Sequence, residues 1–368
     1  MHEFFMKMAL DLAQKGIGRV NPNPLVGAVI VKHGKVIGCG FHEFYGGPHA
    51  EVMAINDAIQ AGCTDFASTT LYVTLEPCCH FGKTPPCTSL IIKSGIPSVV
   101  VGMEDPNPLV SGKGITILKN AGIEVQVGVL EDACRKLNPV FITYITTKKP
   151  YVLLKSGMSL DGKIATVTGD SKWITCEESR KDVHRLRSQY MAVMCGIGTV
   201  LSDDPELTVR IIEGKNPIRI ITDSHLRIPL ESNIVRTARN IRTIIATTEN
   251  SDSKKAEKLT TMGVELIYTK LRDGRVDLQE LISILGTMNI DSILLEGGGT
   301  LAFSALKAEI VHAVRFYISP ILLGGVKAKT VIAGDGFSTL SNAFKIEHIH
   351  VDFCGSDIVI QGAICLPA

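Results

Sequence analysis

The chain has almost no net charge and lacks any hydrophobic run long enough to cross a membrane. Lysine and arginine together number 38 against 37 aspartate and glutamate residues, which gives a formal charge of +1. So small a charge provides no overall attraction to nucleic acid or to an anionic membrane, although local basic pockets remain compatible with it. We therefore expect a small molecule as the partner, with no nucleic acid and no membrane.

The sequence also lacks low-complexity tracts, internal repeats and the features of a signal peptide. We expect a cytoplasmic protein that forms a homo-oligomer. In a reducing compartment its ten cysteines are free thiols or metal ligands rather than disulfides. Seven of them have the pattern of small core residues: Cys39, Cys63, Cys134, Cys176, Cys195, Cys354 and Cys365.

At 368 residues the chain is longer than one hydrophobic core usually supports, so we expect two domains. The segment 1–16 has helical spacing, with Phe4, Phe5, Met8 and Leu12 as its apolar set. Strands and helices then alternate, which predicts an α/β domain with a largely buried sheet. The expected strands are 26–31, 35–40, 71–75 and 98–102, and the expected helices are 49–61, 86–94 and 114–120.

This alternation stops at 143–150, where polar residues and Lys148-Lys149-Pro150 interrupt it. We place the boundary there, which gives predicted domains of 1–146 and 147–368. The second half again has an α/β pattern, with its ligand expected where loops leave the strand ends. Its expected strands are 151–155, 192–196, 218–222, 243–247 and 292–295, and its helices include 177–189 and 300–308.

Three residues with metal-binding side chains, His49, Cys78 and Cys87, form the most informative motif. They suit a catalytic zinc, because three protein ligands leave the fourth tetrahedral position to water. Zinc lowers the pKa of bound water to around 7, from about 15.7 in bulk. Glu51 follows His49 closely and is placed to move protons to a ring nitrogen and to departing ammonia. The motif predicts hydrolytic deamination of an amino-heterocycle, with Glu51 as the catalytic residue.

The ligand spacing departs from the H-x-E and P-C-x-x-C pattern of zinc deaminases, because eight residues separate Cys78 from Cys87. Within that interval Cys79 and His80 are rival ligands. The alternative is a closed structural site with four protein ligands and a merely solvated Glu51. The long interval and the otherwise idle carboxylate argue against it.

Residues around the ligands are candidates to bind the deamination substrate. Lys83 and Thr84, between the two cysteines, offer a charge and a hydroxyl to a phosphate. Asn23 and His42 precede the motif. They either face the heterocycle, or Asn23 caps a turn and His42 lies at the surface.

Longer segments resemble the bifunctional deaminase/reductase of riboflavin biosynthesis. In the first half these are 21–27 (NPNPLVG), 49–51 (HAE) and 74–87 (TLEPCCHFGKTPPC). In the second half they are 155–165 (KSGMSLDGKIA), 171–175 (SKWIT), 203–210 (DDPELTVR) and 296–301 (EGGGTL). The long step between the cysteines belongs to that family, and the resemblance covers nearly the whole chain.

The resemblance implies a cytidine-deaminase-like, three-layer N-terminal domain and an α/β C-terminal domain similar to dihydrofolate reductase. It implies one zinc ion in the first domain and NADPH in the second. The implied substrate is 2,5-diamino-6-ribosylamino-4(3H)-pyrimidinone 5′-phosphate. Deamination gives 5-amino-6-(5-phosphoribosylamino)uracil, and hydride from NADPH then reduces the ribosyl group to a ribityl chain.

The same resemblance assigns contacts in the second half. The glycine triplet 297–299 joins a strand to a helix, an arrangement that suits a phosphate, although an ordinary tight turn is the alternative. The implied cofactor contacts are Met158, Trp173, Thr199, Asp203, Gly298, Gly299, Thr300, Leu301, Ala302, Phe303 and Ser304. The implied substrate contacts are Ser171, Arg187, Leu207, Arg210 and Glu296, with Lys155 as a further candidate near the reacting sugar.

Arg187 and Arg210 suit a phosphate and Glu296 suits sugar hydroxyls, with surface salt bridges as the alternative for the arginines. Two other interpretations of the chain are a nucleotide or tRNA deaminase with an unrelated nucleotide-binding domain, and a nonenzymatic sensor with structural zinc. The near-zero charge and the glycine-rich turn argue against the first. The sequence assigns neither the proton donor of the reduction nor the residues that select NADPH over NADH.

Overall fold

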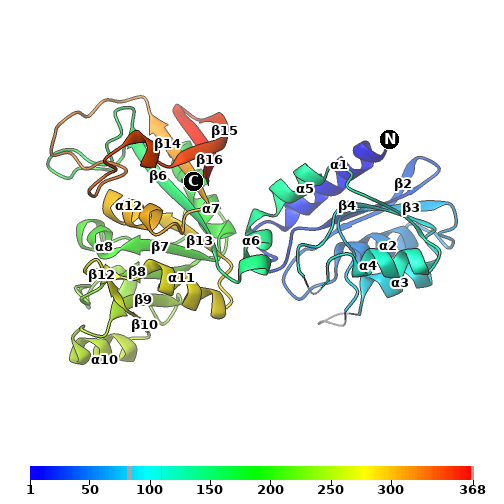
Figure 1. Ribbon diagram of the computed structural model, residues 1–368, viewed down its shortest axis with the longest axis horizontal. Helices are drawn as coiled ribbons and strands as arrows, with labels where there is room; N and C mark the ends of the chain where they lie inside the picture. The colour runs from blue at the N-terminus through cyan, green and yellow to red at the C-terminus, as the bar shows by residue number, and fades with distance from the viewer. Residues whose placement is uncertain (81–84, 109, 366–368) are drawn as a thin grey trace. The chain divides into compact units, whose positions relative to one another are not determined.

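The computed structural model describes residues 1–80, 85–108 and 110–365, and the chain divides into two compact units, Met1–Lys148 and Lys149–Ala368 (Figure 1). Both units are α/β, as the alternating pattern predicts. The first unit contains α1 (His2–Ala13), a 3-10 turn (Gln14–Gly16), β1 (Gly27–Lys32), β2 (Lys35–Phe41), α2 (Ala50–Gln60), β3 (Thr69–Leu75), α3 (Cys87–Ser94), β4 (Ser98–Met103), α4 (Lys113–Asn120), β5 (Glu124–Val127), α5 (Glu131–Leu137) and α6 (Pro139–Thr147).

In the described part of the first unit a five-stranded sheet has the order β2-β1-β3-β4-β5. β1 runs antiparallel to β2 and β3, whereas β3, β4 and β5 are parallel. Alternate residues of β1 point to opposite faces. Ala28 and Ile30 therefore pack with α2 and α3, while Val29 and Val31 pack with α1. The sheet lies between two helical layers, as expected for a three-layer domain (Figure 1).

The buried face of α1 differs from the predicted one. Phe4 is 65% exposed, and Met8 and Leu12 are only partly buried. Ala9 faces the sheet because Gly27 allows a close approach, since a Cβ at Gly27 would lie 1.9 Å from the Ala9 carbonyl oxygen. The buried residues of the helix are Phe5, Met6, Ala9, Leu10 and Ala13.

The expected interruption at 143–150 occurs only at its C-terminal end, because α6 continues through Thr147. Thr146 and Thr147 remain in the helix by donating their hydroxyl hydrogens to the carbonyls of Ile142 and Thr143. Lys148 then takes a φ of 57° and ends the helix.

The second unit contains a nine-stranded sheet within its described residues, in the order β10-β9-β8-β7-β13-β6-β14-β16-β15. Its elements are β6 (Tyr151–Ser159), α7 (Glu177–Gln189), β7 (Ala192–Gly196), α8 (Ile197–Asp203), β8 (Ile218–Thr222), α9 (Asn233–Arg236), β9 (Thr243–Thr248), α10 (Ser253–Thr261), β10 (Glu265–Thr269), β11 (Leu271–Arg272), β12 (Arg275–Val276), α11 (Leu278–Thr287), β13 (Ser292–Glu296), α12 (Gly299–Lys307), β14 (Ala313–Ser319), a 3-10 turn (Leu340–Asn342), β15 (Lys345–Cys354) and β16 (Asp357–Cys365).

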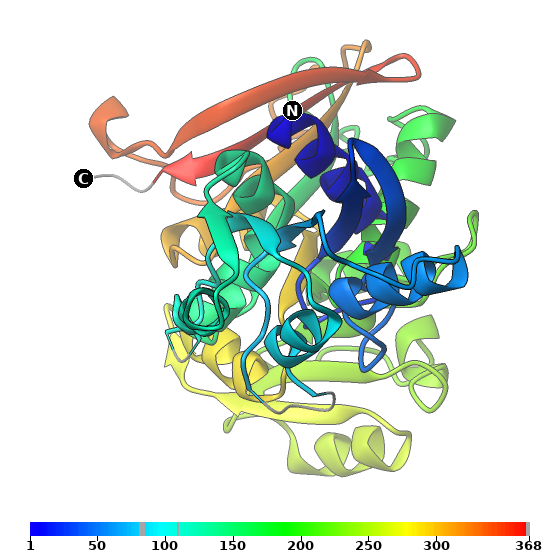
Figure 2. The same cartoon turned by 90° about the vertical axis from the view of Figure 1, so that its right-hand side faces the viewer.

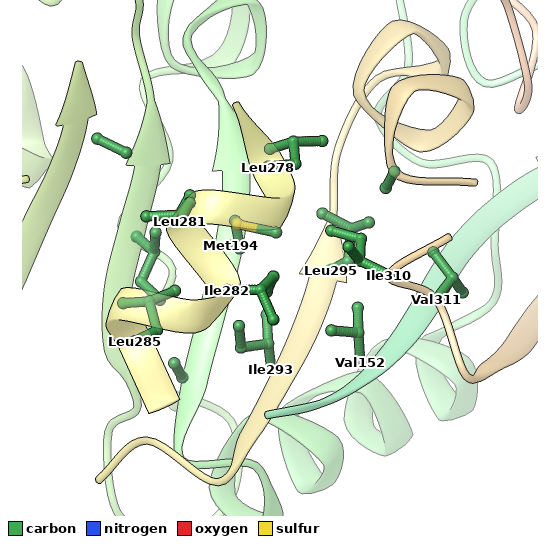
Figure 3. Packing of buried hydrophobic residues seen from close by; sticks show 14 of the residues in the cluster. Val152, Met194, Leu278, Leu281, Ile282, Leu285, Ile293, Leu295, Ile310 and Val311 are labelled. Atoms are coloured by element: carbon green, nitrogen blue, oxygen red, sulfur yellow. The ribbon is translucent and has the colours of Figure 1, made fainter. Parts of the chain in front are cut away.

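The strands from β10 to β14 in this order are all parallel, so their carboxyl ends meet at one edge of the sheet. The hairpin of β15 and β16 continues the sheet in antiparallel fashion and is the orange-red ribbon of Figure 2. On one face, α11 places Leu281 and Leu285 against a cluster that includes Met194 and Ile293 (Figure 3). This packing fixes the strands whose ends carry the polar residues.

The cysteines without a predicted metal role are free thiols, but most are not core residues. Cys134 and Cys195 are buried as expected, whereas Cys39 is exposed because its neighbours Gly38 and Gly40 face α2. The others are partly exposed, namely Cys63, Cys176, Cys354 and Cys365. Separately, no helix in the described part of the chain has the length and apolar character needed to span a membrane.

Candidate active sites

In the described residues one group of side chains is suited to hold a metal ion, and it consists of His49, Cys78 and Cys87. Their ligand atoms all lie within 4.8 Å of one another. The His49 Nδ1 atom is 3.2 Å from the Cys87 sulfur and 3.4 Å from the Cys78 sulfur. One imidazole and two sulfurs at this separation fit zinc, and such a set leaves one tetrahedral position for water.

Each of the three residues lies at the end of an element. His49 is the N-cap of α2, Cys87 is the first residue of α3, and Cys78 follows the end of β3. Helix N-termini carry partial positive charge, which favours thiolates. The Cys87 backbone N–H donates to the Cys78 sulfur at 3.3 Å. The side-chain hydrogen bonds from Cys87 and His49 hold the pKa of Cys78 at about 4, despite its burial.

Cys79 and His80, the rival ligands, are not part of this group. The described geometry therefore favours three protein ligands over a closed site with four.

Glu51 lies in the first turn of α2 and is 3% exposed. Burial raises the pKa of its carboxyl group to about 7, and the negative charge of Cys78 acts in the same direction. A buried carboxyl group of raised pKa beside a metal-binding group is suited to transfer protons at neutral pH.

Asn23 and His42 lie beside the metal-binding group. The His42 Nδ1 atom is 2.9 Å from the Pro48 carbonyl oxygen, and its Nε2 atom is 3.0 Å from the Asn23 amide nitrogen. Because a carbonyl only accepts, Nδ1 carries the proton and Nε2 accepts from Asn23. The ring of His42 is buried, with its centroid 5.6 Å from that of His49. This placement excludes a surface location for His42. Burial lowers the pKa of its imidazole and so favours the neutral form.

Lys83 and Thr84, the predicted phosphate contacts of this site, lie outside the residues that the structure describes. Their role stays a prediction, as do the substrate-binding roles of Asn23 and His42.

Glu76 has no predicted role, yet it organises the segment next to Cys78. Its buried carboxylate accepts hydrogen bonds from the backbone N–H groups of Asp105, Gly112 and Ile115, at 3.1, 3.0 and 3.2 Å. These bonds tie the Cys78 strand end to the chain around 105–115. The signal in the sequence is an acidic residue directly before Pro-Cys, but its backbone partners are distant along the chain.

The second unit contains a cavity of about 1310 Å³ at the carboxyl ends of its parallel strands. Fourteen of the predicted contacts line it: Lys155, Ser171, Trp173, Arg187, Thr199, Asp203, Leu207, Arg210, Glu296, Gly298, Gly299, Thr300, Leu301 and Ser304. Met158, Ala302 and Phe303 are not among the lining residues. Met158 pairs with Ile318 of β14, and the other two are buried on the inner face of α12.

Glu296, the last residue of β13, lies between two cations in this cavity. Its carboxylate accepts from Arg187 at 2.7 and 2.9 Å, and the Lys155 Nζ atom is 3.3 Å away. Burial raises the pKa of Glu296, but the charges of Arg187 and Lys155 outweigh it and hold the pKa at about 2. Burial lowers the pKa of Lys155. One carboxylate and two cations leave a net positive charge, which suits a phosphorylated substrate.

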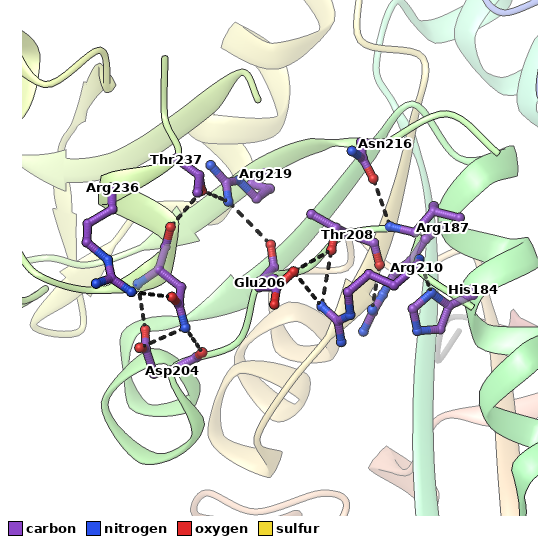
Figure 4. Close-up of polar contacts among 12 residues, drawn as sticks. His184, Arg187, Asp204, Glu206, Thr208, Arg210, Asn216, Arg219, Arg236 and Thr237 are labelled. Carbon is purple, nitrogen blue, oxygen red and sulfur yellow. Dashed lines mark hydrogen bonds and ion pairs between the residues drawn. The ribbon is translucent and has the colours of Figure 1, made fainter. Parts of the chain in front are cut away.

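Arg187 also positions the loop that carries the other predicted substrate contacts (Figure 4). Its Nη1 atom donates to the Thr208 carbonyl at 3.1 Å. Arg210 donates its backbone N–H to His184 at 3.0 Å and pairs with Glu206 at 3.2 Å. The Arg210 side chain is 45% exposed, so it can reach a ligand in the cavity.

Arg219 on β8 is a second residue without a predicted role. It is fully buried, and its guanidinium donates to the Glu206 carbonyl at 3.3 Å and to the Thr237 hydroxyl at 2.8 Å (Figure 4). Burial lowers its pKa to about 10. Arg219 therefore fixes the start of the loop from within the core.

Two glycine turns border the middle of the cavity, at the ends of β7 and β13. A Cβ atom on Gly198 or Gly298 would meet no other atom within 4 Å, so both turns face open space. Gly298 is the N-cap of α12 and has no side chain to cover the first helical N–H groups. The turns therefore fit the phosphates of a dinucleotide cofactor, which bind to helix N-termini.

Comparisons with known proteins agree with both sites. The family model of the RibD C-terminal domain matches residues 150–360, and that of the cytidine and deoxycytidylate deaminase zinc-binding region matches residues 1–103. The riboflavin biosynthesis protein RibD of Actinobacillus pleuropneumoniae is 48% identical over 363 residues, which cover 99% of this chain and 95% of that protein. The chain belongs to the RibD family.

Other RibD proteins and solved structures extend this match. RibD of Aquifex aeolicus is 46% identical, with 97% of this chain and 96% of that protein covered. The crystal structure of a diaminohydroxyphosphoribosylaminopyrimidine deaminase/5-amino-6-(5-phosphoribosylamino)uracil reductase from Thermotoga maritima is 42% identical, with a TM-score of 0.85 and 99% of each chain covered. For Acinetobacter baumannii RibD, form 1, the identity is 36%, the TM-score 0.87 and the coverage 99% of each chain.

As a RibD protein, the chain is a bifunctional deaminase/reductase of riboflavin biosynthesis, which confirms the expected fold and the two activities. Its cofactors are zinc in the deaminase domain and NADPH in the reductase domain. The near full-length RibD match disfavours both a tRNA deaminase with an unrelated second domain and a nonenzymatic zinc sensor.

Proposed function

We propose that the chain deaminates 2,5-diamino-6-ribosylamino-4(3H)-pyrimidinone 5′-phosphate and then reduces the resulting 5-amino-6-(5-phosphoribosylamino)uracil to its ribityl form. The observation that carries this proposal is the pair of sites on one chain. One unit places a three-ligand metal group beside a buried Glu51, and the other places Lys155 and Glu296 in a large cavity. The Thermotoga maritima relative is named for both reactions.

At the deaminase site we assign His49, Cys78 and Cys87 as zinc ligands. Bound zinc would supply Lewis-acid activation of water in the position that these ligands leave open. Glu51 takes the proton of the attacking water and delivers protons to the ring nitrogen and the leaving amino group, so that ammonia departs. Asn23 keeps its carbonyl oxygen and one N–H for the heterocycle, because His42 accepts only one of its hydrogens.

At the reductase site bound NADPH would supply a hydride to C1′ of the ribosyl group, and we assign Lys155 as the proton donor. Breaking of the C1′–O4′ bond leaves its electron pair on O4′. The Lys155 ammonium then protonates O4′. Glu296 holds Lys155 in place, and its lowered pKa keeps it ionised for this purpose. Arg210, which is only partly paired, binds the substrate phosphate.

The proposal is tested by supplying the pyrimidinone phosphate, zinc and NADPH to the full chain. Ammonia release and NADPH oxidation are both expected, with the ribityl compound as product. Folded, zinc-loaded protein that gives neither signal contradicts the proposal. Activity on cytidine or tRNA instead of the pyrimidinone would reassign the first site.

Cellular location and assembly stay predictions. We propose a cytoplasmic homo-oligomer with no nucleic-acid or membrane partner. The net charge of +1 supports only the absence of these two partners. Light scattering of the purified chain tests the oligomeric state, and a single-chain mass would contradict it.

A further inference from the structure

We infer that Arg227 and Arg275 form the subsite that binds the 2′-phosphate of NADPH, the group that NADH lacks. The inference rests on the proposed function, because it takes NADPH as the cofactor of this cavity. It assigns the residues that select between the two cofactors.

The order of the strands indicates where the adenosine end of the cofactor lies. Lys155 and Glu296 mark the reacting end, on the neighbouring strands β6 and β13. The glycine turns that suit the diphosphate follow β13 and β7, the next strand along. Continuing in this direction, the cavity is lined by residues after β8 and by β12, so this end receives the adenosine half.

Arg227 stands on a rigid turn after β8. Its neighbours Leu226 and Ile228 are 1% and 0% exposed, so Arg227 between them points outward, where it lines the cavity. The turn is fixed by Asp223, which accepts the Ile228 N–H at 2.8 Å and the Leu226 N–H at 3.2 Å. Among the described residues Arg227 has no hydrogen bond or ion pair, and its donors are available to a ligand.

Arg275 reaches the same end of the cavity from the β11–β12 hairpin. Its Nη1 atom donates to the Ser304 hydroxyl of α12 at 3.2 Å. The next residue, Val276, donates its backbone N–H to the Ser224 hydroxyl at 3.0 Å. Ser224 lies in the turn that carries Arg227, so this bond joins the two arginine-bearing segments.

Positive charge is in excess at this end of the cavity, and no carboxylate of the described residues forms an ion pair with Arg227 or Arg275. The segments 222–227 and 274–278 contribute no carboxylate to the described lining, because Asp223 is fully buried and Asp277 caps α11. Asp273 pairs with Lys307 at 3.0 Å and lines an adjoining, smaller cavity, which Arg275 also borders. Two guanidinium groups without a carboxylate partner match a phosphate dianion, which they bind by directed, charge-assisted hydrogen bonds.

Calorimetric titration of the full chain with adenosine 2′,5′-bisphosphate and with 5′-AMP tests the inference by binding alone. In Arg227→Gln and Arg275→Gln the affinity for the bisphosphate is expected to fall about ten-fold or more, with the affinity for 5′-AMP nearly unchanged. Arg272→Gln is the matched control, since this exposed arginine of the same hairpin bonds to Gln279 and does not line the cavity. Retained binding of 5′-AMP confirms that the reductase unit of each variant is folded.

The double variant should also lose the preference for NADPH over NADH in the ratio of their KM values. Equal weakening of both adenosine ligands, or a preference that survives in the double variant, overturns the inference and leaves the proposed function intact. If the wild-type protein binds neither the bisphosphate nor NADPH, the proposed cofactor is wrong, and this inference is wrong as well.

Discussion

Glu296 and Arg187 are joined in the reductase cavity by two parallel hydrogen bonds of 2.7 and 2.9 Å. Arg187 simultaneously donates to the Thr208 carbonyl, and Glu296 simultaneously contacts Lys155. The pair therefore connects the proposed proton donor to the loop that carries Leu207 and Arg210. Arg187 was predicted to bind phosphate directly, but three of its contacts are to the protein, which favours a positioning role.

The Glu296 carboxylate makes the stability of the reductase unit depend on acid pH. Its pKa is about 2 in the folded chain against an ordinary 4.5, so its contribution is complete above pH 4.5 and is lost as pH falls through 2. This contribution is on the order of 3 kcal/mol. Denaturant unfolding should show a steeper loss of stability below pH 4.5 in the wild type than in Glu296→Gln. Identical pH profiles would refute the assigned ion pair.

Replacement of Lys155 by Gln should lower kcat of the reduction by about 100-fold or more, because the proton donor is lost. The affinity for adenosine 2′,5′-bisphosphate should not change, since Lys155 lies at the other end of the cavity. Burial lowers the pKa of Lys155, so its ammonium should lose the proton at a lower pH than an ordinary lysine, whose pKa is 10.5. The rate of reduction by the wild type should therefore fall as the pH rises, beginning below pH 10.5. If Lys155→Gln keeps its kcat, another group donates the proton.

Zinc content separates the ligands from their rivals. Cys87→Ser should bind much less zinc and lose deamination, whereas Cys79→Ser should retain both, because Cys79 lies outside the metal-binding group. Metal analysis of the purified variants and ammonia release provide the measurements. Reduction of the deaminated intermediate is the internal control, and it should persist in both variants. Zinc loss in Cys79→Ser would indicate a fourth protein ligand.

Glu76→Gln tests the missed carboxylate. A side-chain amide offers one acceptor oxygen in place of two, so at least one of the three backbone N–H groups loses its partner. We expect the free energy of unfolding of the deaminase unit to fall by roughly 1–3 kcal/mol. Glu104→Gln is the matched control, since Glu104 is exposed in the same region. Equal stability of the two variants in urea would show that the three hydrogen bonds contribute little.

The fold was largely predictable because its strands are short apolar runs separated by turn residues. The expected strands 192–196 and 218–222 coincide with β7 and β8. The face of α1 was not predictable from hydrophobicity. It depends on the absence of a side chain at Gly27, which lets Ala9 approach the sheet while Phe4 remains outside.

The zinc group was predictable because it consists of rare side chains at family-specific spacing. The roles of Glu76 and Arg219 were not predictable, since each binds backbone groups that are distant in sequence. Every residue type offers a backbone carbonyl, so the residue types at those positions do not reveal the contact. Nothing in the sequence groups Arg227 with Arg275, for a related reason. Only the turn after β8 and the β11–β12 hairpin bring them to one cavity.

The most direct test of the account compares two substrates in Glu51→Gln, with zinc retention confirmed. This variant should release no ammonia and oxidise no NADPH when given the diamino substrate. It should nevertheless oxidise NADPH at the wild-type rate when given 5-amino-6-(5-phosphoribosylamino)uracil, because Lys155 and Glu296 are untouched. Ammonia release at the wild-type rate, or no reduction of the supplied intermediate by folded protein, would contradict two independent sites acting in sequence.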